Sequence, residues 1–161
     1  MFRKKKLNSY NQMKKVLAVA SIGGHWVQLL RIASSLEATH EVAYMSTHEK
    51  CATMVEGHRF YKIKDFSRWD AYKVVPAFFS AMNTVRKENP NVVITTGAAP
   101  GLIVLFAAFC LGKKTVWIDS IANVNHLSLC GRIAKKFASR FYTQWEELAT
   151  DGVHFAGNVI G

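Results

Sequence analysis

The chain has 161 residues, of which 50% are apolar and 20% are charged. That composition excludes a disordered chain, and the length suits one domain with a hydrophobic core better than two. The formal net charge of +10 is concentrated in residues 1–15, which hold six Lys or Arg and no acidic residue. We therefore expect a basic arm at residues 1–14, followed by a single domain at residues 15–161.

A basic arm on a nearly balanced domain favours an anionic surface as its partner, although a solubilising tail is an alternative. Nucleic acid is a poor match, because the basic residues are not interleaved with aromatic ones. The three cysteines (Cys51, Cys110 and Cys130) are widely spaced and form no CxxC or His-rich pairing. This spacing predicts a reducing compartment and no metal site, and the absence of a signal-peptide pattern predicts a cytoplasmic protein.

The first half of the chain predicts alternating strands and helices. A short apolar run ends in two glycines, and apolar residues then recur at helical spacing from Trp26 to Leu36. We expect strands at Lys15–Ser21, Glu41–Ser46 and Phe60–Ile63.

The second half repeats this pattern. A helix is expected at Asp70–Lys87, closed by Asn89-Pro90, and the apolar run Leu102–Leu111 has about half of the roughly 20 residues that span a bilayer, which predicts a buried or membrane-dipping helix. Another helix is expected at Leu127–Ser139. Strands are expected at Val92–Thr95, Thr115–Ile118 and Arg140–Gln144. Continuous apolar strands alternating with helices predict a Rossmann-like, doubly wound parallel α/β sheet.

Ligands of such sheets bind beyond the carboxyl ends of the strands, and three loops there carry polar residues or glycine. The candidate residues for binding an acceptor or phosphate are Ser21, Gly23, Gly24, Thr96, Gly97, Pro100, Ser120 and Asn123. Glycines let backbone N–H groups approach an anion, and Pro100 suits a first helical turn.

His25 and Asp119 are the candidate catalytic residues. An imidazole titrates near neutral pH, so His25 suits removal of a proton from an acceptor hydroxyl, or it only bonds the turn. Asp119 orients an acceptor or accepts a proton; alternatively, it caps a helix or holds a neighbouring loop.

In this order and at these spacings, the loops resemble the bacterial PssD and CpsF-type polysaccharide glycosyltransferase subunits. They also resemble the eukaryotic counterpart, the membrane-recruiting subunit of the second N-acetylglucosaminyltransferase of asparagine-linked glycan synthesis. The matching segments are ASIGGHWVQLL (20–30), TTGAAPG (95–101) and WIDSIANVNHLSLCGRIAKKFASRFYTQWEEL (117–148). Asp119 stands where the eukaryotic members have glutamate.

The resemblance implies the acceptor-binding, N-terminal half of a GT-B glycosyltransferase that is divided between two polypeptides. Its implied reaction moves a sugar from a UDP-sugar to a polyprenyl-pyrophosphate-linked glycan in exopolysaccharide or capsule synthesis. A PssE-like partner would hold the UDP-sugar, so this chain would bind no cofactor or metal itself and would be inactive alone. His25 then becomes the candidate general base. Glucuronic acid, galactose and N-acetylglucosamine remain possible donor sugars.

The eukaryotic members begin with a membrane-spanning segment, whereas this chain offers the basic arm. We expect peripheral, monotopic attachment to anionic phospholipid at the cytoplasmic face of the inner membrane. The candidate membrane residues are Arg3, Lys4, Lys5, Lys6, Trp69, Tyr72, Phe78 and Phe79.

Two alternatives remain at this stage. One is a non-catalytic membrane scaffold for the partner subunit. The other is an unrelated small nucleotide- or phosphate-binding α/β protein, which would need an acidic residue near Tyr44–His48 to hold a ribose, and none is there.

Overall fold

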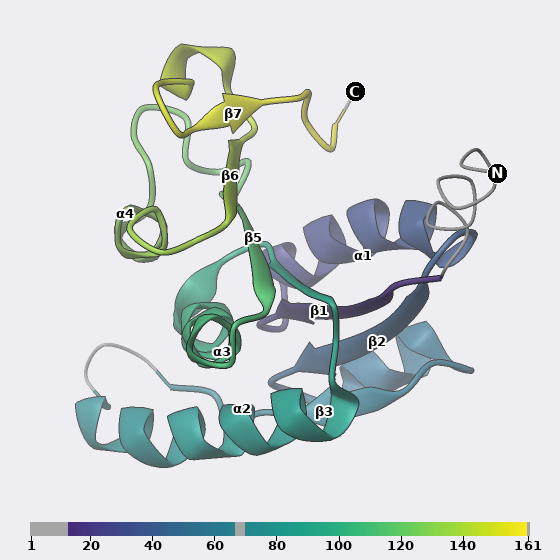
Figure 1. The fold of residues 1–161 in the computed structure, drawn as a ribbon. Helices are drawn as coiled ribbons and strands as arrows, with labels where there is room; N and C mark the ends of the chain where they lie inside the picture. The colour runs from purple at the N-terminus through teal and green to yellow at the C-terminus, as the bar shows by residue number, and fades with distance from the viewer. Residues whose placement is uncertain (1–12, 67–69, 161) are drawn as a thin grey trace, which may run out of the picture.

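The computed structural model describes residues 13–66 and 70–160, which form one parallel sheet flanked by helices (Figure 1). The strand order is β3-β2-β1-β4-β5-β6-β7, and every neighbouring pair is parallel. The strands are β1 (Lys15–Ala20), β2 (Glu41–Ser46), β3 (Phe60–Lys62), β4 (Val92–Thr95), β5 (Lys114–Ile118), β6 (Arg140–Thr143) and β7 (His154–Phe155).

Helices cover both faces of the sheet, as a doubly wound fold requires (Figure 1). Alternate residues of β1 therefore enter different cores: Val16 and Ala18 pack under α1, whereas Leu17 and Val19 pack under α2 and α3. The helices are α1 (Gly24–Glu37), α2 (Val74–Glu88), α3 (Ala98–Cys110) and α4 (Leu129–Ala134), with 3-10 helices at Glu49–Val55, Ala71–Lys73 and Glu146–Leu148.

Successive strands are added to one side of β1 up to β3 and to its other side from β4 onward, so the strand order reverses between β1 and β4. β1 pairs with β2 on one side and with β4 on the other, so the connections leave it in opposite directions. In open parallel sheets this switch point leaves a crevice at the carboxyl ends of the strands. The loops that follow β1, β4 and β5 all meet there.

The predicted strands and the α/β fold are confirmed, but the bounds of three helices are wrong. α2 begins at Val74 rather than Asp70, because a 3-10 helix at Ala71–Lys73 precedes it. α3 begins at Ala98 rather than Leu102, because Gly97 adopts a φ of 121° and starts the helix directly after Thr96. Pro100 and Gly101 therefore lie in its first turn. α4 is shorter than the predicted Leu127–Ser139 helix, and β7 was not anticipated because it has only two residues.

The basic arm with Arg3, Lys4, Lys5 and Lys6 lies outside the described residues, as does Trp69. Among residues 13–66 and 70–160, no helix is both long and apolar enough to cross a membrane. The apolar α3 instead packs against α2 and the sheet, with Val104 and Leu105 fully buried.

The close approach of α3 to β4 leaves no room for a side chain at Gly101. A Cβ atom at this position would lie 2.2 Å from Oγ1 of the fully buried Thr95. Although Ala normally favours a helix, we expect Gly101→Ala to lower the free energy of unfolding by about 1–3 kcal/mol through overpacking. Urea unfolding followed by tryptophan fluorescence measures this.

The matched control is Gly24→Ala, also in the first turn of a helix, where an added Cβ meets nothing within 4 Å. It should leave the urea midpoint nearly unchanged. Equal midpoints for the two variants would contradict the close approach of α3 to β4.

Candidate active site

A pocket of about 240 Å³ opens at the switch point, at the carboxyl ends of β1, β4 and β5. It gathers side chains from three segments that are distant in sequence. Its lining residues are His25, Ala98, Ser120, Ala122, Asn123, Ser128, Leu129 and Cys130. The three loops that sequence analysis singled out therefore converge on one cavity.

His25 and Thr96 are joined by two reciprocal hydrogen bonds. The ring Nδ1 of His25 lies 2.8 Å from the carbonyl oxygen of Thr96, and the Thr96 hydroxyl donates to the His25 carbonyl at 2.7 Å. Because a carbonyl oxygen can only accept, Nδ1 carries the proton and Nε2 of the neutral ring keeps its lone pair. Within the described part of the chain, Nε2 has no hydrogen-bond partner, so it is available to a substrate.

The ring of His25 also packs against Gly97. A Cβ atom at Gly97 would lie 3.0 Å from the ring Cε1 and 3.2 Å from Nδ1, so a side chain there would crowd the imidazole. Ala98 follows with a φ of 66°, a left-handed conformation that is strained for alanine, and it lines the pocket. The turn between β4 and α3 is thus shaped around the histidine.

The amino-terminal ends of α1 and α3 both lie at this crevice. Their N-cap residues, Gly23 and Gly97, carry no side chain, so no side-chain cap satisfies the first N–H groups of either of these described helices. Such N–H groups, together with the positive end of the helix dipole, attract anionic oxygen atoms. This edge of the sheet suits a phosphate or another oxygen-rich group.

Asp119 lies beneath the pocket rather than in it, and its side chain is almost completely buried. Its Oδ1 accepts hydrogen bonds from Trp117 Nε1 (3.1 Å) and the Ser128 hydroxyl (2.6 Å). Its Oδ2 accepts from the Ser128 N–H (2.9 Å) and Asn123 Nδ2 (3.3 Å). The four donors come from one loop and its preceding strand, so the carboxylate fixes the loop that carries Ser120 and Asn123.

Cys130 is the only cysteine lining this pocket in the described structure. Burial raises the pKa of its thiol above the ordinary value, and the Asp119 carboxylate raises it further. The thiol therefore stays protonated at neutral pH and does not supply a nucleophile.

The remaining candidate residues do not line the pocket. Gly23 and Gly24 form the turn before His25, Pro100 is buried in the first turn of α3, and Ser21 is half-buried outside the lining. Sequence analysis missed five residues of the lining. Ala98, Ala122 and Leu129 have apolar side chains that give no chemical signal, and nothing in the spacing of Ser128 and Cys130 places them at the pocket. Among residues 13–66 and 70–160, no group of three or more His, Cys, Asp or Glu side chains is arranged to hold a metal ion.

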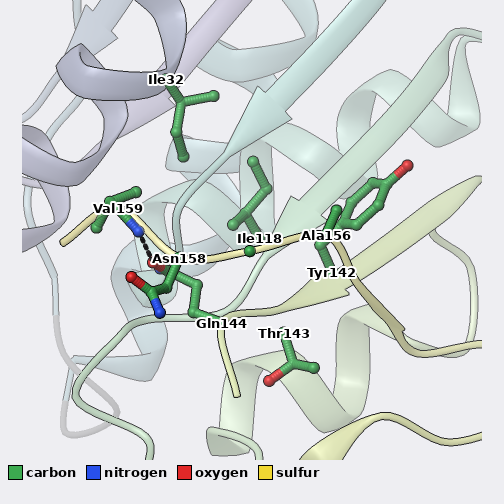
Figure 2. Close-up of a pocket in the computed structure, with 9 residues that line it drawn as sticks. Ile32, Ile118, Tyr142, Thr143, Gln144, Ala156, Asn158 and Val159 are labelled. Atoms are coloured by element: carbon green, nitrogen blue, oxygen red, sulfur yellow. Dashed lines mark hydrogen bonds between the residues drawn. The ribbon is translucent and has the colours of Figure 1, made fainter. Parts of the chain in front are cut away.

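A second pocket, of about 280 Å³, lies between α1, the ends of β5 and β6, and the carboxyl-terminal tail (Figure 2). The tail residues Ala156, Asn158 and Val159 form one side, and Ile32 and Ile118 form another. Sequence analysis did not anticipate this pocket, because it is created by the tail folding back over the sheet.

Residues 33–159 match the model of the family described as oligosaccharide biosynthesis protein Alg14 like. The chain belongs to this family. The UDP-N-acetylglucosamine transferase subunit ALG14 of Yarrowia lipolytica is 35% identical over 79 residues, which are 45% of this chain and 37% of that protein. The expected resemblance to the eukaryotic transferase subunit is thereby confirmed, whereas the PssD and CpsF-type assignment stays a prediction.

A second group of relatives carries the name UDP-N-acetylglucosamine--N-acetylmuramyl-(pentapeptide) pyrophosphoryl-undecaprenol N-acetylglucosamine transferase. The protein of Clostridium kluyveri is 30% identical over 124 residues, covering 67% of this chain and 35% of that protein. The chain thus spans less than half the length of these curated relatives.

The fold is similar to that of MurG from Acinetobacter baumannii, with a TM-score of 0.76 at 17% identity. That match covers 90% of this chain and 46% of the MurG chain. UDP-N-acetylglucosamine 2-epimerase from Rickettsia bellii gives a TM-score of 0.70 at 13% identity, over 92% and 46% of the two chains. The likeness establishes a Rossmann-like unit of the GT-B type.

Asp119→Asn tests whether the carboxylate holds the loop. An amide has one accepting oxygen and presents an NH₂ group to donors, so two of the four donors lose their acceptor. We expect the free energy of unfolding to fall by about 2 kcal/mol or more, measured by urea unfolding.

Asn123→Ala is the control for this variant, because it removes only the longest of the four contacts, at 3.3 Å. Its expected loss is below about 1 kcal/mol. If Asp119→Asn unfolds at the same urea concentration as the unchanged protein, the carboxylate does not organise the loop.

Proposed function

We propose that this chain is the acceptor-binding, membrane-associating subunit of a two-component glycosyltransferase. The enzyme transfers a sugar from a UDP-sugar to a polyprenyl-pyrophosphate-linked glycan. A second, PssE-like subunit holds the UDP-sugar, and this chain is inactive without it. Exopolysaccharide or capsule synthesis at the cytoplasmic face of the inner membrane is the proposed setting.

The observation that carries the proposal is the free Nε2 of His25 beside two uncapped helix N-termini. In the reaction, Nε2 takes the proton of an acceptor hydroxyl while that oxygen bonds to the anomeric carbon of the donor sugar. The bond from the anomeric carbon to UDP breaks, and UDP leaves with the electron pair. The hydrogen bond from Nδ1 to Thr96 supports this role, because it holds the ring in the tautomer that a base needs.

The other pocket residues suit the polar part of the acceptor. The N–H groups at the starts of α1 and α3 would bind pyrophosphate oxygens, and Ser120 and Asn123 would bind sugar hydroxyls. Asp119 would act by fixing this loop, since its two oxygens already accept four hydrogen bonds.

The proposed partner would hold the donor sugar. A GT-B enzyme is built from two Rossmann-like units, and residues 13–66 and 70–160 form one such unit, whose fold matches 46% of the MurG chain. The names of those relatives make UDP-N-acetylglucosamine the first donor to screen, followed by UDP-linked glucuronic acid and galactose.

Membrane attachment is supported by an exposed apolar surface that spans three helices. Phe78 of α2 packs on both Phe79 and Phe106, and Phe106 contacts Phe109 and Phe137, so the aromatic rings form one continuous group. This apolar surface consists of Tyr72, Val75, Phe79, Phe106, Phe109 and Ile133, each at least 40% exposed.

Two of the helices that carry the apolar surface also reach the pocket. These are α3 and α4, which supply the pocket residues Ala98, Leu129 and Cys130 at their amino-terminal ends. Exposed Arg132 and Lys135 on and after α4 would meet anionic head groups. A lipid held on this surface would have to extend about 12 Å along α3, from Phe106 to Ala98, to reach the pocket.

His25→Ala should lower kcat of the reconstituted pair by about 100- to 10,000-fold, because the general base is lost. Turnover is measured as UDP release with a lipid-pyrophosphate-sugar acceptor. The control is His126→Ala, since His126 is exposed in the neighbouring loop and does not line the pocket. Full turnover with His25→Ala would show that this chain is a membrane scaffold and that its partner carries the chemistry.

Phe79→Asp and Phe106→Asp should each weaken binding to phosphatidylglycerol vesicles by about tenfold or more. A buried phenylalanine contributes roughly 1.5–3 kcal/mol, and a carboxylate would also be repelled by anionic head groups. Co-sedimentation measures the affinity.

Phe155→Asp is the matched control, because Phe155 is 39% exposed on β7, away from the apolar surface. Deletion of residues 1–12 tests the basic arm separately and should release protein into the soluble fraction. Equal vesicle binding by all three aspartate variants would argue against this docking surface.

A further inference from the structure

Two buried glutamine side chains meet behind the pocket. Gln28 lies on α1, one turn after His25, and Gln144 directly follows β6. The Nε2 of Gln144 donates to the Oε1 of Gln28 at 2.8 Å, and the two side chains come from residues 116 positions apart. The residues are only 7% and 3% exposed. Buried amides are costly unless their hydrogen bonds are satisfied, so this pair must have further partners.

One set of partners is the pocket loop. Gln28 donates through Nε2 to the Ser120 hydroxyl (3.2 Å) and accepts at Oε1 from the Ile121 N–H (3.2 Å). Gln144 donates through Nε2 to the Asp119 carbonyl (2.9 Å), and the next residue, Trp145, donates through its indole to the Ile121 carbonyl (2.8 Å). Three consecutive loop residues are therefore held by these side chains.

The other partner is the carboxyl-terminal tail. The Oε1 of Gln144 accepts the N–H of Val159 at 3.1 Å, as Figure 2 shows. Arg31 of α1 donates to the carbonyl of the same residue at 2.9 Å. Ala156 and Asn158 are exposed, whereas Gln28 and Gln144 are buried, so the tail is the accessible end of this hydrogen-bond network.

We propose that Gln28 and Gln144 are positioning residues that couple the placement of the tail at Val159 to the placement of the pocket loop Asp119–Asn123. The amide of Gln144 is planar, so its two ends cannot turn independently. Its Nε2 must face the two acceptors, Gln28 Oε1 and the Asp119 carbonyl, and this leaves Oε1 for the tail. When the tail withdraws, the constraint on this amide is lost, and the loop loosens.

The consequence for acceptor binding rests on the proposed function, but the coupling itself does not. Ser120 lines the pocket and receives its hydrogen bond from Gln28. A displaced tail should therefore weaken acceptor binding more than it slows chemistry at His25. A binding event at the exposed tail would be transmitted to the pocket by the same route.

Val159→Pro tests the coupling, because proline lacks the N–H that Gln144 accepts. In the folded chain, we expect amide hydrogen exchange at Ile121, measured by NMR, to accelerate by about fivefold, as loss of one buried hydrogen bond implies. Core amides such as Val93 should keep their exchange rates. In the reconstituted pair, KM for the acceptor should rise several-fold with a smaller change in kcat.

Ile160→Pro is the matched control. It removes the neighbouring N–H, which donates only to Asn158 Oδ1 at 3.1 Å, and should leave exchange at Ile121 unchanged. Unchanged exchange at Ile121 in Val159→Pro would overturn the coupling, and so would equal acceleration in the two proline variants.

If Val159→Pro also accelerates hydrogen exchange of core amides, Arg31→Ala is the second test of the coupling. It releases the tail carbonyl without altering the backbone, and Arg31 is exposed. Faster hydrogen exchange at Ile121 alone in Arg31→Ala would support the coupling. An unchanged exchange rate at Ile121 would overturn it. If hydrogen exchange accelerates selectively at Ile121 while the reconstituted pair shows no turnover that depends on the acceptor, that result would support the coupling and contradict the proposed function.

Discussion

The arrangement of the site depends on the two hydrogen bonds that join His25 to Thr96. They connect residues 71 positions apart and tie the start of α1 to the loop after β4. Each such bond contributes only about 1 kcal/mol to stability, yet together they fix the relative position of two helix N-termini. The same contact selects the tautomer of His25. This pair of hydrogen bonds thus sets both the relative position of the two helix N-termini and the ring nitrogen of His25 that carries the proton.

Asp119 and His25 divide the work of the pocket between them. A buried carboxylate is tolerated only when donors replace the water it has lost, and Asp119 has four of them from Trp117, Asn123 and Ser128. A carboxylate occupied in this way is poorly placed to take a proton from a substrate. His25 keeps one ring nitrogen free, so in the proposed reaction the residue that fixes the loop would differ from the residue that takes the proton.

The sequence allowed the fold to be predicted more completely than the site. Strands β1, β2 and β4 are buried apolar runs bounded by glycine or polar residues, and a pattern of that kind is local. Pro100 was expected in a first helical turn and lies in one, but the exact start of α3 was missed because it follows from the positive φ of Gly97, which the residue type permits without requiring it. The Gln28–Gln144 pair is long-range, and no spacing in the chain indicates it. The partners of Asp119 are 2 to 9 residues away, yet the sequence does not show that all four of their donors turn toward one carboxylate.

The pocket is too small to enclose the whole of the proposed acceptor. At about 240 Å³ it is smaller than the roughly 300–1,000 Å³ typical of small-molecule sites, and a lipid-linked glycan is larger than such ligands. Under the proposed function, the crevice would enclose only the reacting end of the acceptor. The apolar surface on α2, α3 and α4 would hold the lipid, and a second unit would close the donor side. His25, at the boundary between these regions, is where an acceptor held by this chain would meet a donor held by its partner.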